Sequence, residues 1–254
     1  YQKWPVTMDE YSPWFQAHVF ASGALSAKYP LDTLHHLFEK SYHSNFFVIN
    51  WITGEVVSGY WPGFALLLTP FAFIGMPWLC NPVLVALAVI ALHRLAVRLD
   101  FSTQQQGWVI LLAIASPAFT LNGMSFYSMP AHLLLNALFA LCLVKPDPRR
   151  LFLAGLVGGY ALCLHNRLPH LAFALPWLVW HAFFGESRLK HVGWLLAGYL
   201  PFSLLLGLGW VLVTRDVNFV SQTRAIAEAA ALVPIQPQPL WSTLAGYFKF
   251  FTWP

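Results

Sequence analysis

The chain alternates long apolar segments with short polar connections, and this pattern limits its fold more than any single motif. Apolar residues make up 58% of its 254 residues and charged residues 9%. About 25% of the residues are charged in an average soluble domain. A water-soluble fold of this length does not need so much apolar surface. The sequence therefore predicts an all-α polytopic membrane protein whose solvent is the bilayer.

The apolar segments give an expected number of spans. A spanning helix needs about 20 apolar residues, so the shorter segments need flanking residues to cross. We expect about six spans, and orientation should follow the short loops rich in Lys and Arg, which stay in the cytoplasm. The expected spans are residues 79–99, 108–121, 131–144, 151–164, 168–184 and 192–213. The cytoplasmic charges are then Arg94 and Arg98, Lys145, Arg149 and Arg150, and Arg188 and Lys190.

One apolar segment, 64–76, does not fit this alternation, because a full crossing there would move the acidic first region to the wrong side. It also holds or adjoins several Pro and Gly residues, which make it a poor straight span. We expect a helix that lies along the outer interface or re-enters it. The expected organisation is an outer-face loop at 1–78 with interfacial helices, a bundle at 79–213 and an outer-face segment at 214–254.

Composition also excludes some classes of function. The net charge of +4 comes from few residues without a basic cluster, so it indicates membrane topology and no nucleic-acid partner. Cys80, Cys142 and Cys163 lie in apolar stretches without paired spacing, so neither a disulfide framework nor a zinc site is expected. The chain lacks an initial Met and stops as a new aromatic segment begins. We therefore expect a fragment that lacks a first span and a C-terminal part.

Two adjacent carboxylates, Asp9 and Glu10, stand just before Pro13 at an expected helix start. A carboxylate in such a place can take a proton from a hydroxyl, or hold a divalent cation such as Mg or Mn with its neighbour. The alternative is a structural pair that balances the helix dipole.

A second polar group lies between two apolar segments, at His165-Asn166-Arg167-Leu168-Pro169-His170. An arginine at an outer helix end can bind a phosphate with two parallel hydrogen bonds. The alternative is that Arg167 extends to lipid headgroups and that the histidines lie at the interface.

Further histidines stand at helical spacing. His35, Glu39 and His43 repeat every four residues and share one helix face, which permits a metal site but favours an amphipathic interfacial helix. His132, near the start of an expected span, is more often a packed residue than a catalytic one.

The order of these features resembles the GT-C glycosyltransferases, and within them the bacterial protein-mannosyltransferase-like and aminoarabinose-transferase-like enzymes. The resemblance runs through nearly the whole chain. It depends on the acidic pair in the first loop, on a span that ends in Arg94 and Arg98, and on two Pro-rich stretches between them. These stretches are SGYWPGFALLLTP at 58–70 and GMPWLCNP at 75–82.

The resemblance implies a GT-C-like helix bundle that transfers a sugar from a polyprenyl-phosphate donor to an acceptor hydroxyl, on the periplasmic side of a plasma membrane. Asp9 matches the loop aspartate that acts as base or metal ligand, and Glu10 is its partner. Arg167 stands where members often carry an Arg-Pro pair, and implies a contact with the donor phosphate. Tyr60, before the Pro-rich turn, and His132 are further candidates for donor binding. The acceptor, whether glycan, lipid or protein, stays open.

Two other functions compete with this interpretation. A transporter or flippase would use the acidic pair and Arg167 to bind its substrate, but transporters usually carry ionisable residues near the bilayer midplane and often contain repeats. The expected spans are almost free of charge and show no repeat. A structural subunit of a membrane complex would explain the apolar content but not the polar first loop.

Overall fold

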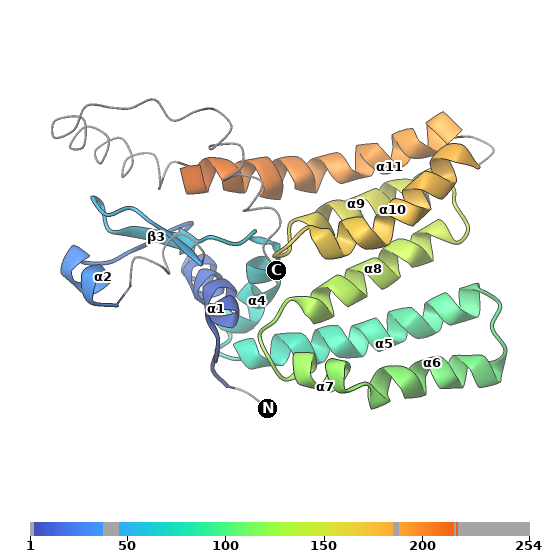
Figure 1. Cartoon of the computed structure of the whole chain (residues 1–254), viewed down its shortest axis with the longest axis horizontal. Helices are drawn as coiled ribbons and strands as arrows, with labels where there is room; N and C mark the ends of the chain where they lie inside the picture. The colour runs from blue at the N-terminus through green and yellow to red at the C-terminus, as the bar shows by residue number, and fades with distance from the viewer. Residues whose placement is uncertain (1–2, 38–45, 185–187, 216, 218–254) are drawn as a thin grey trace, which may run out of the picture.

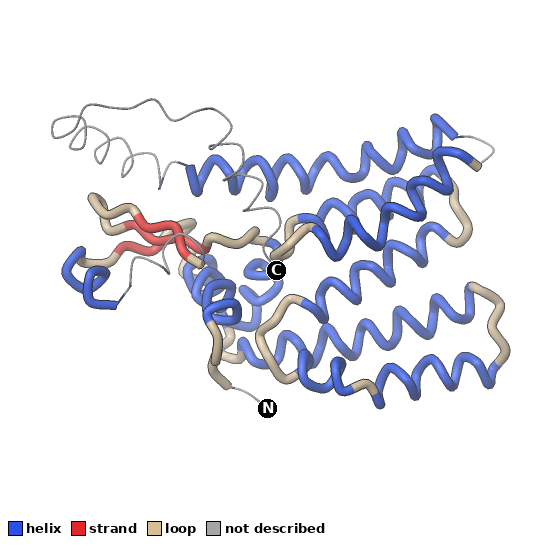
Figure 2. Tube along the Cα trace, viewed as in Figure 1, coloured by secondary structure: helices blue, strands red, loops and turns tan. Residues whose placement is uncertain are grey.

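The computed structural model describes residues 3–37, 46–184, 188–215 and 217, and these are mostly helical, as predicted. Long helices lie side by side in a bundle, and a smaller part with α1 and a sheet lies at one end of it (Figures 1 and 2). The bundle helices are α5 (Cys80–Arg98), α6 (Thr103–Ala115), α7 (Pro117–Gly123), α8 (Met129–Leu143), α9 (Pro148–Leu162), α10 (Leu168–Phe183) and α11 (Arg188–Phe202).

Each expected span falls on helix, but few of the helices have spanning length. The helical stretches Pro77–Arg98 and Lys190–Arg215, of 22 and 26 residues, are long and apolar enough to cross a membrane, both with a mean hydropathy of 1.9. The second includes a π-helix, η2 (Ser203–Leu208). By contrast, α8 and α9 have 15 residues each, which span about 22 Å of a hydrocarbon core that is about 30 Å thick. Length alone thus supports fewer crossings than the six expected.

The expected span at 108–121 is interrupted between α6 and α7. Ser116 has extended backbone angles, φ −69° and ψ 120°, and Pro117 is the first residue of α7. A proline disfavours helical geometry in the residue before it, so the break follows from the sequence at this point.

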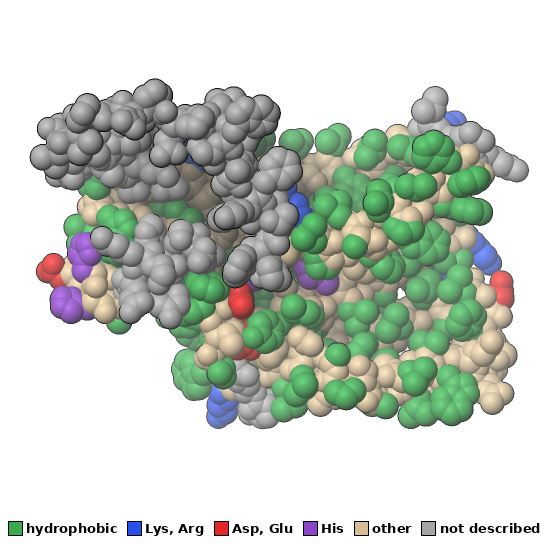
Figure 3. Space-filling view, in the orientation of Figure 1, with side chains coloured by type: hydrophobic (Ala, Val, Ile, Leu, Met, Phe, Trp, Pro, Cys, Tyr) green, Lys and Arg blue, Asp and Glu red, His purple; other side chains and the backbone are tan. Residues whose placement is uncertain are grey.

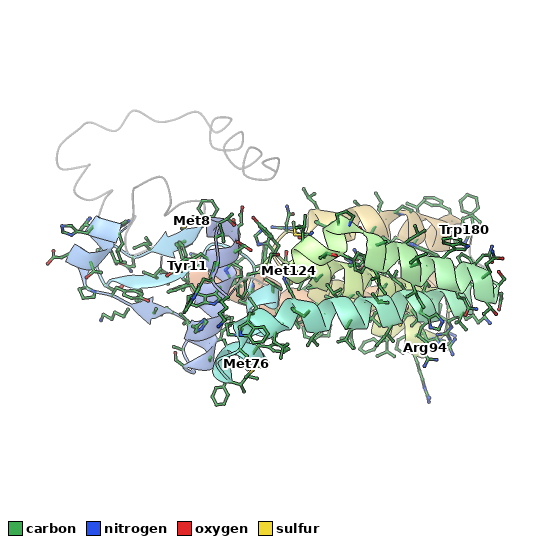
Figure 4. The ribbon with its side chains drawn as sticks, turned by 90° about the horizontal axis from the view of Figure 1, so that it is seen from below. Met8, Tyr11, Met76, Arg94, Met124 and Trp180 are labelled. Atoms are coloured by element: carbon green, nitrogen blue, oxygen red, sulfur yellow. The ribbon has the colours of Figure 1, made fainter. Side chains whose placement is uncertain are left out.

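The smaller part contains a sheet that the sequence analysis did not predict. Its strands are β1 (Ala27–Lys28), β2 (Phe47–Ile49) and β3 (Glu55–Ser58), antiparallel in the order β1-β3-β2. The helices of this part are α1 (Met8–Ala21), α2 (Leu31–Leu37), α4 (Gly63–Phe73) and the short 3₁₀ helix η1 (Pro77–Leu79). Figures 1 and 4 show α1 running across the direction of the bundle helices. Because α4 covers residues 63–73, most of the apolar segment 64–76 is helical.

The cores of the two parts meet at α4. Phe64 and Leu68 of α4 are fully buried in one cluster with Leu84 of α5 and Phe126, which precedes α8. Burying a side chain of this kind contributes about 1.5–3 kcal/mol. This shared core holds the loops at one end of the bundle against α1.

Helices α9 and α11 approach so closely that their backbones touch. A Cβ atom on Gly155 would lie 2.1 Å from the carbonyl oxygen of Leu195, and one on Gly198 would lie 2.2 Å from that of Phe152. Small residues allow such contact between helices, and hydrocarbon surroundings favour it because packing replaces the hydrophobic effect there. These glycines therefore fix the distance between α9 and α11.

A buried polar cluster crosses the same region of the bundle. The Nδ1 atom of His170 lies 2.6 Å from Asn136 Oδ1, and its Nε2 atom lies 2.7 Å from the Tyr199 hydroxyl. An amide oxygen only accepts, so Nδ1 carries a proton, and Nε2 shares the second hydrogen bond with the Tyr199 hydroxyl. Gly158 leaves room for this group, because a Cβ there would be 2.4 Å from the Tyr199 hydroxyl oxygen. Both nitrogens of the imidazole are thus hydrogen-bonded.

Candidate functional site

The candidate site is the group Asp9, Tyr60, His165 and Arg167, which the fold brings to one end of the bundle. These residues come from α1, from the loop between β3 and α4, and from the loop between α9 and α10. Three of them, Asp9, Tyr60 and Arg167, were predicted from the sequence. In Figure 4, Met8 and Tyr11 mark the α1 side of this region, at the opposite end of the bundle from Arg94.

Asp9 and Tyr60 are joined directly, because the Tyr60 hydroxyl donates a hydrogen bond to Asp9 Oδ1. Burial, followed by this bond and the negative charge of Asp9, raises the pKa of the Tyr60 hydroxyl above its ordinary value of 10. Tyr60 therefore stays protonated and acts as a donor. The carboxylate is held by one oxygen, and its Oδ2 atom remains for another donor.

Helix α1 and strand β3 are fastened together next to this pair. Ser12 and Ser58 share a hydrogen bond of 2.7 Å between their hydroxyl oxygens, and the backbone N–H of Ser58 donates to Gln16 Oε1 at 2.9 Å. Ser58 Oγ also accepts from the backbone N–H of Tyr60 at 3.1 Å. Because these polar side chains of α1 are buried, they fix the backbone of Tyr60 relative to the helix that carries Asp9.

The start of α4 is bonded to the end of α9, which brings the second loop to the first. The N–H groups of Gly63 and Phe64 donate to the carbonyls of Cys163 and Leu164, at 2.7 and 3.0 Å. Gly63 is needed here, because its Cβ would lie 2.5 Å from the Cys163 oxygen. Free N–H groups at a helix start are thereby satisfied by the residues just before His165.

His165 completes the group; the sequence analysis noted it within the polar stretch 165–170 but gave it no role in a site. Its ring lies 3.9 Å from the Tyr60 ring, centroid to centroid, at an angle of 58°. Burial lowers the pKa of His165, with a smaller opposing effect from Asp9. The ring is therefore neutral at neutral pH. Only the proximity of the two loops gives His165 a role, since its place in the polar stretch 165–170 does not show which residue it contacts.

Arg167 is placed on an aromatic platform beside Tyr60. Its guanidinium carbon lies 4.8 Å from the centre of the Trp61 ring, a cation–π contact. A Cβ on Gly207, in η2, would lie 3.9 Å from the same indole. Trp61 thus contacts Arg167 and lies next to η2, and it directly follows Tyr60, the partner of Asp9, in the chain. The geometry suits the recognition of a phosphate.

Glu10 is placed differently from Asp9. It is 1% exposed, and its carboxylate accepts from the backbone N–H groups of Val6 at 2.9 Å, Thr7 at 3.2 Å and Phe126 at 3.0 Å. These bonds start α1 and attach it to the loop before α8. Glu10 therefore positions α1, and its two oxygens are already engaged by backbone donors.

The carboxylate pair does not fit a shared metal ion. Adjacent residues on a helix do not face each other, and Glu10 is directed to backbone donors while Asp9 meets Tyr60. Within residues 3–37, 46–184, 188–215 and 217, no group of three or more His, Cys, Asp or Glu side chains could hold a metal. Of the spaced histidine group, His35 stacks on Trp51 at 4.8 Å, while Glu39 and His43 lie outside the described residues.

His132 lies behind the candidate site, in the first turns of α8. It is 6% exposed, and among the described residues its Nδ1 atom has no hydrogen-bond partner. His165 of the candidate site and His170 of the buried polar cluster both lie near it. His132 is therefore a buried neighbour of the two groups.

Asn81 fastens the remaining loop. Its side-chain amide donates to the carbonyls of Asn122, Ser125 and Tyr127 at 3.2, 2.8 and 2.8 Å. The Tyr127 hydroxyl lies 3.1 Å from the hydroxyl oxygen of Thr7, just before α1.

Comparison with known protein families, with characterised proteins and with solved structures gave no match for this chain, so its function is argued from these residues.

Proposed function

We propose that the chain is embedded in a membrane with the candidate site on the extracytoplasmic side. Large apolar side chains are exposed along the bundle, including Leu112 at 66% and Leu205 at 70%. Figure 3 shows hydrophobic side chains spread over much of the visible side of the bundle. Water would make so large an apolar patch costly, and lipid would not. Arg94, Arg98 and the charged loop before α9 lie at the other end, which the positive-inside rule assigns to the cytoplasm.

The function that this geometry supports best is glycosyl transfer from a polyprenyl-phosphate sugar to an acceptor hydroxyl. The observation that carries the proposal is that two neighbouring residues, Tyr60 and Trp61, contact a carboxylate and a guanidinium respectively, at one end of an apolar bundle. The acceptor oxygen would attack the anomeric carbon, and its proton would pass to Asp9. The bond from that carbon to the phosphate oxygen would break, and the phosphate would leave with the electron pair. Arg167 would stabilise its charge.

Each member of the site has a place in this proposal. Tyr60 fixes one oxygen of Asp9 and leaves Oδ2 for the acceptor hydroxyl. His165 supports the Tyr60 ring, and Trp61 supports Arg167. Glu10 keeps α1 in place. The inner membrane is the expected location because the proposed donor is lipid-linked.

The buried cluster of His170, Asn136 and Tyr199 is the observation closest to a transporter, because ionisable residues inside a membrane often mark a substrate path. Its hydrogen bonds are satisfied internally, with both ring nitrogens of His170 used. Such a closed group meets the requirement that polar groups in hydrocarbon be paired. We therefore propose a packing role for the cluster and keep glycosyl transfer as the function.

Arg167 gives a direct test of donor binding. In membranes that contain the full-length protein and a radiolabelled polyprenyl-phosphate sugar, Arg167→Ala should raise the KM for the donor by about 10- to 100-fold, since hydrogen bonds to charged groups contribute about 1.5–3 kcal/mol. Arg167→Lys should recover only part of this, because lysine has no planar group to lie on Trp61. An unchanged KM in both variants would contradict the assignment.

His165 gives a test by pH. Burial lowers its folded pKa below the unfolded value of about 6.5, so the stability it supports is present above that value and lost as pH falls through the folded pKa. His165→Phe keeps a ring against Tyr60 and cannot be protonated. We expect melting temperatures measured from about pH 8 to pH 4 to fall less steeply for His165→Phe than for the parent. Parallel curves would show that His165 is not the titrating group.

A further inference from the structure

A groove lies at the end of the bundle opposite the candidate site, between α9 and α11. Its volume is about 310 Å³, and its lining residues are Pro148, Arg149, Phe152, Leu153 and Trp194. Leu153 and Trp194 are 50% and 42% exposed. The groove lies next to the place where the backbones of α9 and α11 touch at Gly155. It is therefore an apolar hollow on the outside of the bundle.

One cation stands in the wall of this groove. Arg149 is exposed and follows the first residue of α9, where the polar loop enters the helix. Its neighbour Arg150 is held by Asp147 at 3.2 Å and donates to the carbonyl of Lys145 at 3.0 Å. A backbone N–H bond and the two arginines lower the pKa of Asp147, so it stays a carboxylate. Residues 145–150 therefore carry three cations and one anion, and the cation that lines the groove is Arg149.

We propose that this groove binds an anionic phospholipid of the cytoplasmic leaflet. An acyl chain would lie against Phe152, Leu153 and Trp194, and the headgroup phosphate would accept hydrogen bonds from Arg149. Tryptophan favours this level of the bilayer because its ring is apolar and its N–H is polar. Basic pockets between helices on the cytoplasmic side are suited to anionic headgroups. The excess positive charge selects a net-negative lipid over a zwitterionic one, which carries its own cation.

The volume limits what enters. About 310 Å³ lies at the lower end of the roughly 300–1,000 Å³ range of small-molecule pockets, so it holds part of one chain and not a whole lipid. The rest of the lipid would stay in the bilayer. This inference depends on membrane insertion and not on sugar transfer, and its test contains no sugar donor.

The test is lipid binding by the purified full-length protein in detergent, followed by native mass spectrometry with phosphatidylglycerol or phosphatidylcholine of identical chains. We expect phosphatidylglycerol to bind more tightly, and Arg149→Gln to weaken it about fivefold, the effect of about 1 kcal/mol for one cation near the surface. Arg94→Gln is the matched control, since Arg94 is an exposed cation at the same end that does not line the groove. It should leave binding unchanged.

Trp194→Ala separates the chain contact from the headgroup contact, and should weaken both lipids equally. Equal affinity for the two lipids in the parent protein would overturn the proposal. Equal losses of phosphatidylglycerol binding in Arg149→Gln and Arg94→Gln would also overturn it. So would mass spectra in which the parent protein binds a second copy of the chain and no lipid, and Trp194→Ala loses that second copy.

Discussion

Replacing Asp9 with Asn should reduce sugar transfer by about 10²–10⁴-fold, the usual contribution of a positioned base, while the protein stays folded. An asparagine has nearly the same shape and can still accept the Tyr60 hydrogen bond, but it cannot take the acceptor's proton. The measurement is the initial rate of label transfer in membranes at matched expression. KM for the donor should change little, because Asp9 acts on the acceptor.

Two control variants separate chemistry from folding at this site. Tyr60→Phe removes the hydroxyl that holds Asp9 and should lower the rate by about tenfold, within the range for one lost hydrogen bond to a charged group. Glu10→Gln should instead destabilise the protein, because one side-chain oxygen is replaced by a donor that faces backbone N–H groups. If Asp9→Asn keeps full activity, the role of Asp9 as base is wrong.

Gly198→Ala should destabilise the bundle by about 3 kcal/mol or more, although the substitution adds a single methyl group. The new Cβ would lie 2.2 Å from the Phe152 oxygen and close to Gly155, so α9 and α11 must separate. Overpacking with side chains costs about 1–3 kcal/mol, and here the obstacle is backbone, which yields less easily. Thermal unfolding in detergent, followed by the loss of the monomer peak on size exclusion, measures the effect.

Gly193→Ala is the matched control on the same helix. Within the part of the chain that the structure describes, no atom lies within 4 Å of a Cβ at Gly193. Alanine favours a helix over glycine by up to about 1 kcal/mol, so this variant should be neutral or slightly more stable. Both substitutions replace glycine with alanine, but the expected changes in stability have opposite signs. Equal melting temperatures for the two variants would show that backbone contact does not hold α9 to α11.

Helix positions were predictable because long apolar segments and short charged loops carry a strong signal. The segments at 79–99, 131–144, 151–164 and 168–184 match α5, α8, α9 and α10 within a few residues. The break before Pro117 could also have been read from the proline. The small sheet could not, because its strands have two to four residues and show no alternating pattern long enough to recognise.

The candidate site was predictable only in part. Asp9 and Arg167 could be selected because a carboxylate pair and an arginine are unusual beside apolar segments. The different roles of Asp9 and Glu10 depend on tertiary contacts, since only the loop at Phe126 shows which carboxylate is bound to the backbone. The role of His165 could not be assigned from its place in the polar stretch 165–170, because its contact with Tyr60 depends on hydrogen bonds between α4 and the end of α9.

The measurement to make is the fate of a radiolabelled sugar on polyprenyl phosphate in vesicles that contain the full-length protein, followed by separation of the lipid donor from other labelled products. Glycosyl transfer predicts that label leaves the polyprenyl phosphate and becomes covalently attached to an acceptor, and that Asp9→Asn prevents this. Label that crosses the membrane while still attached to its original lipid would contradict the proposed function and would indicate a flippase.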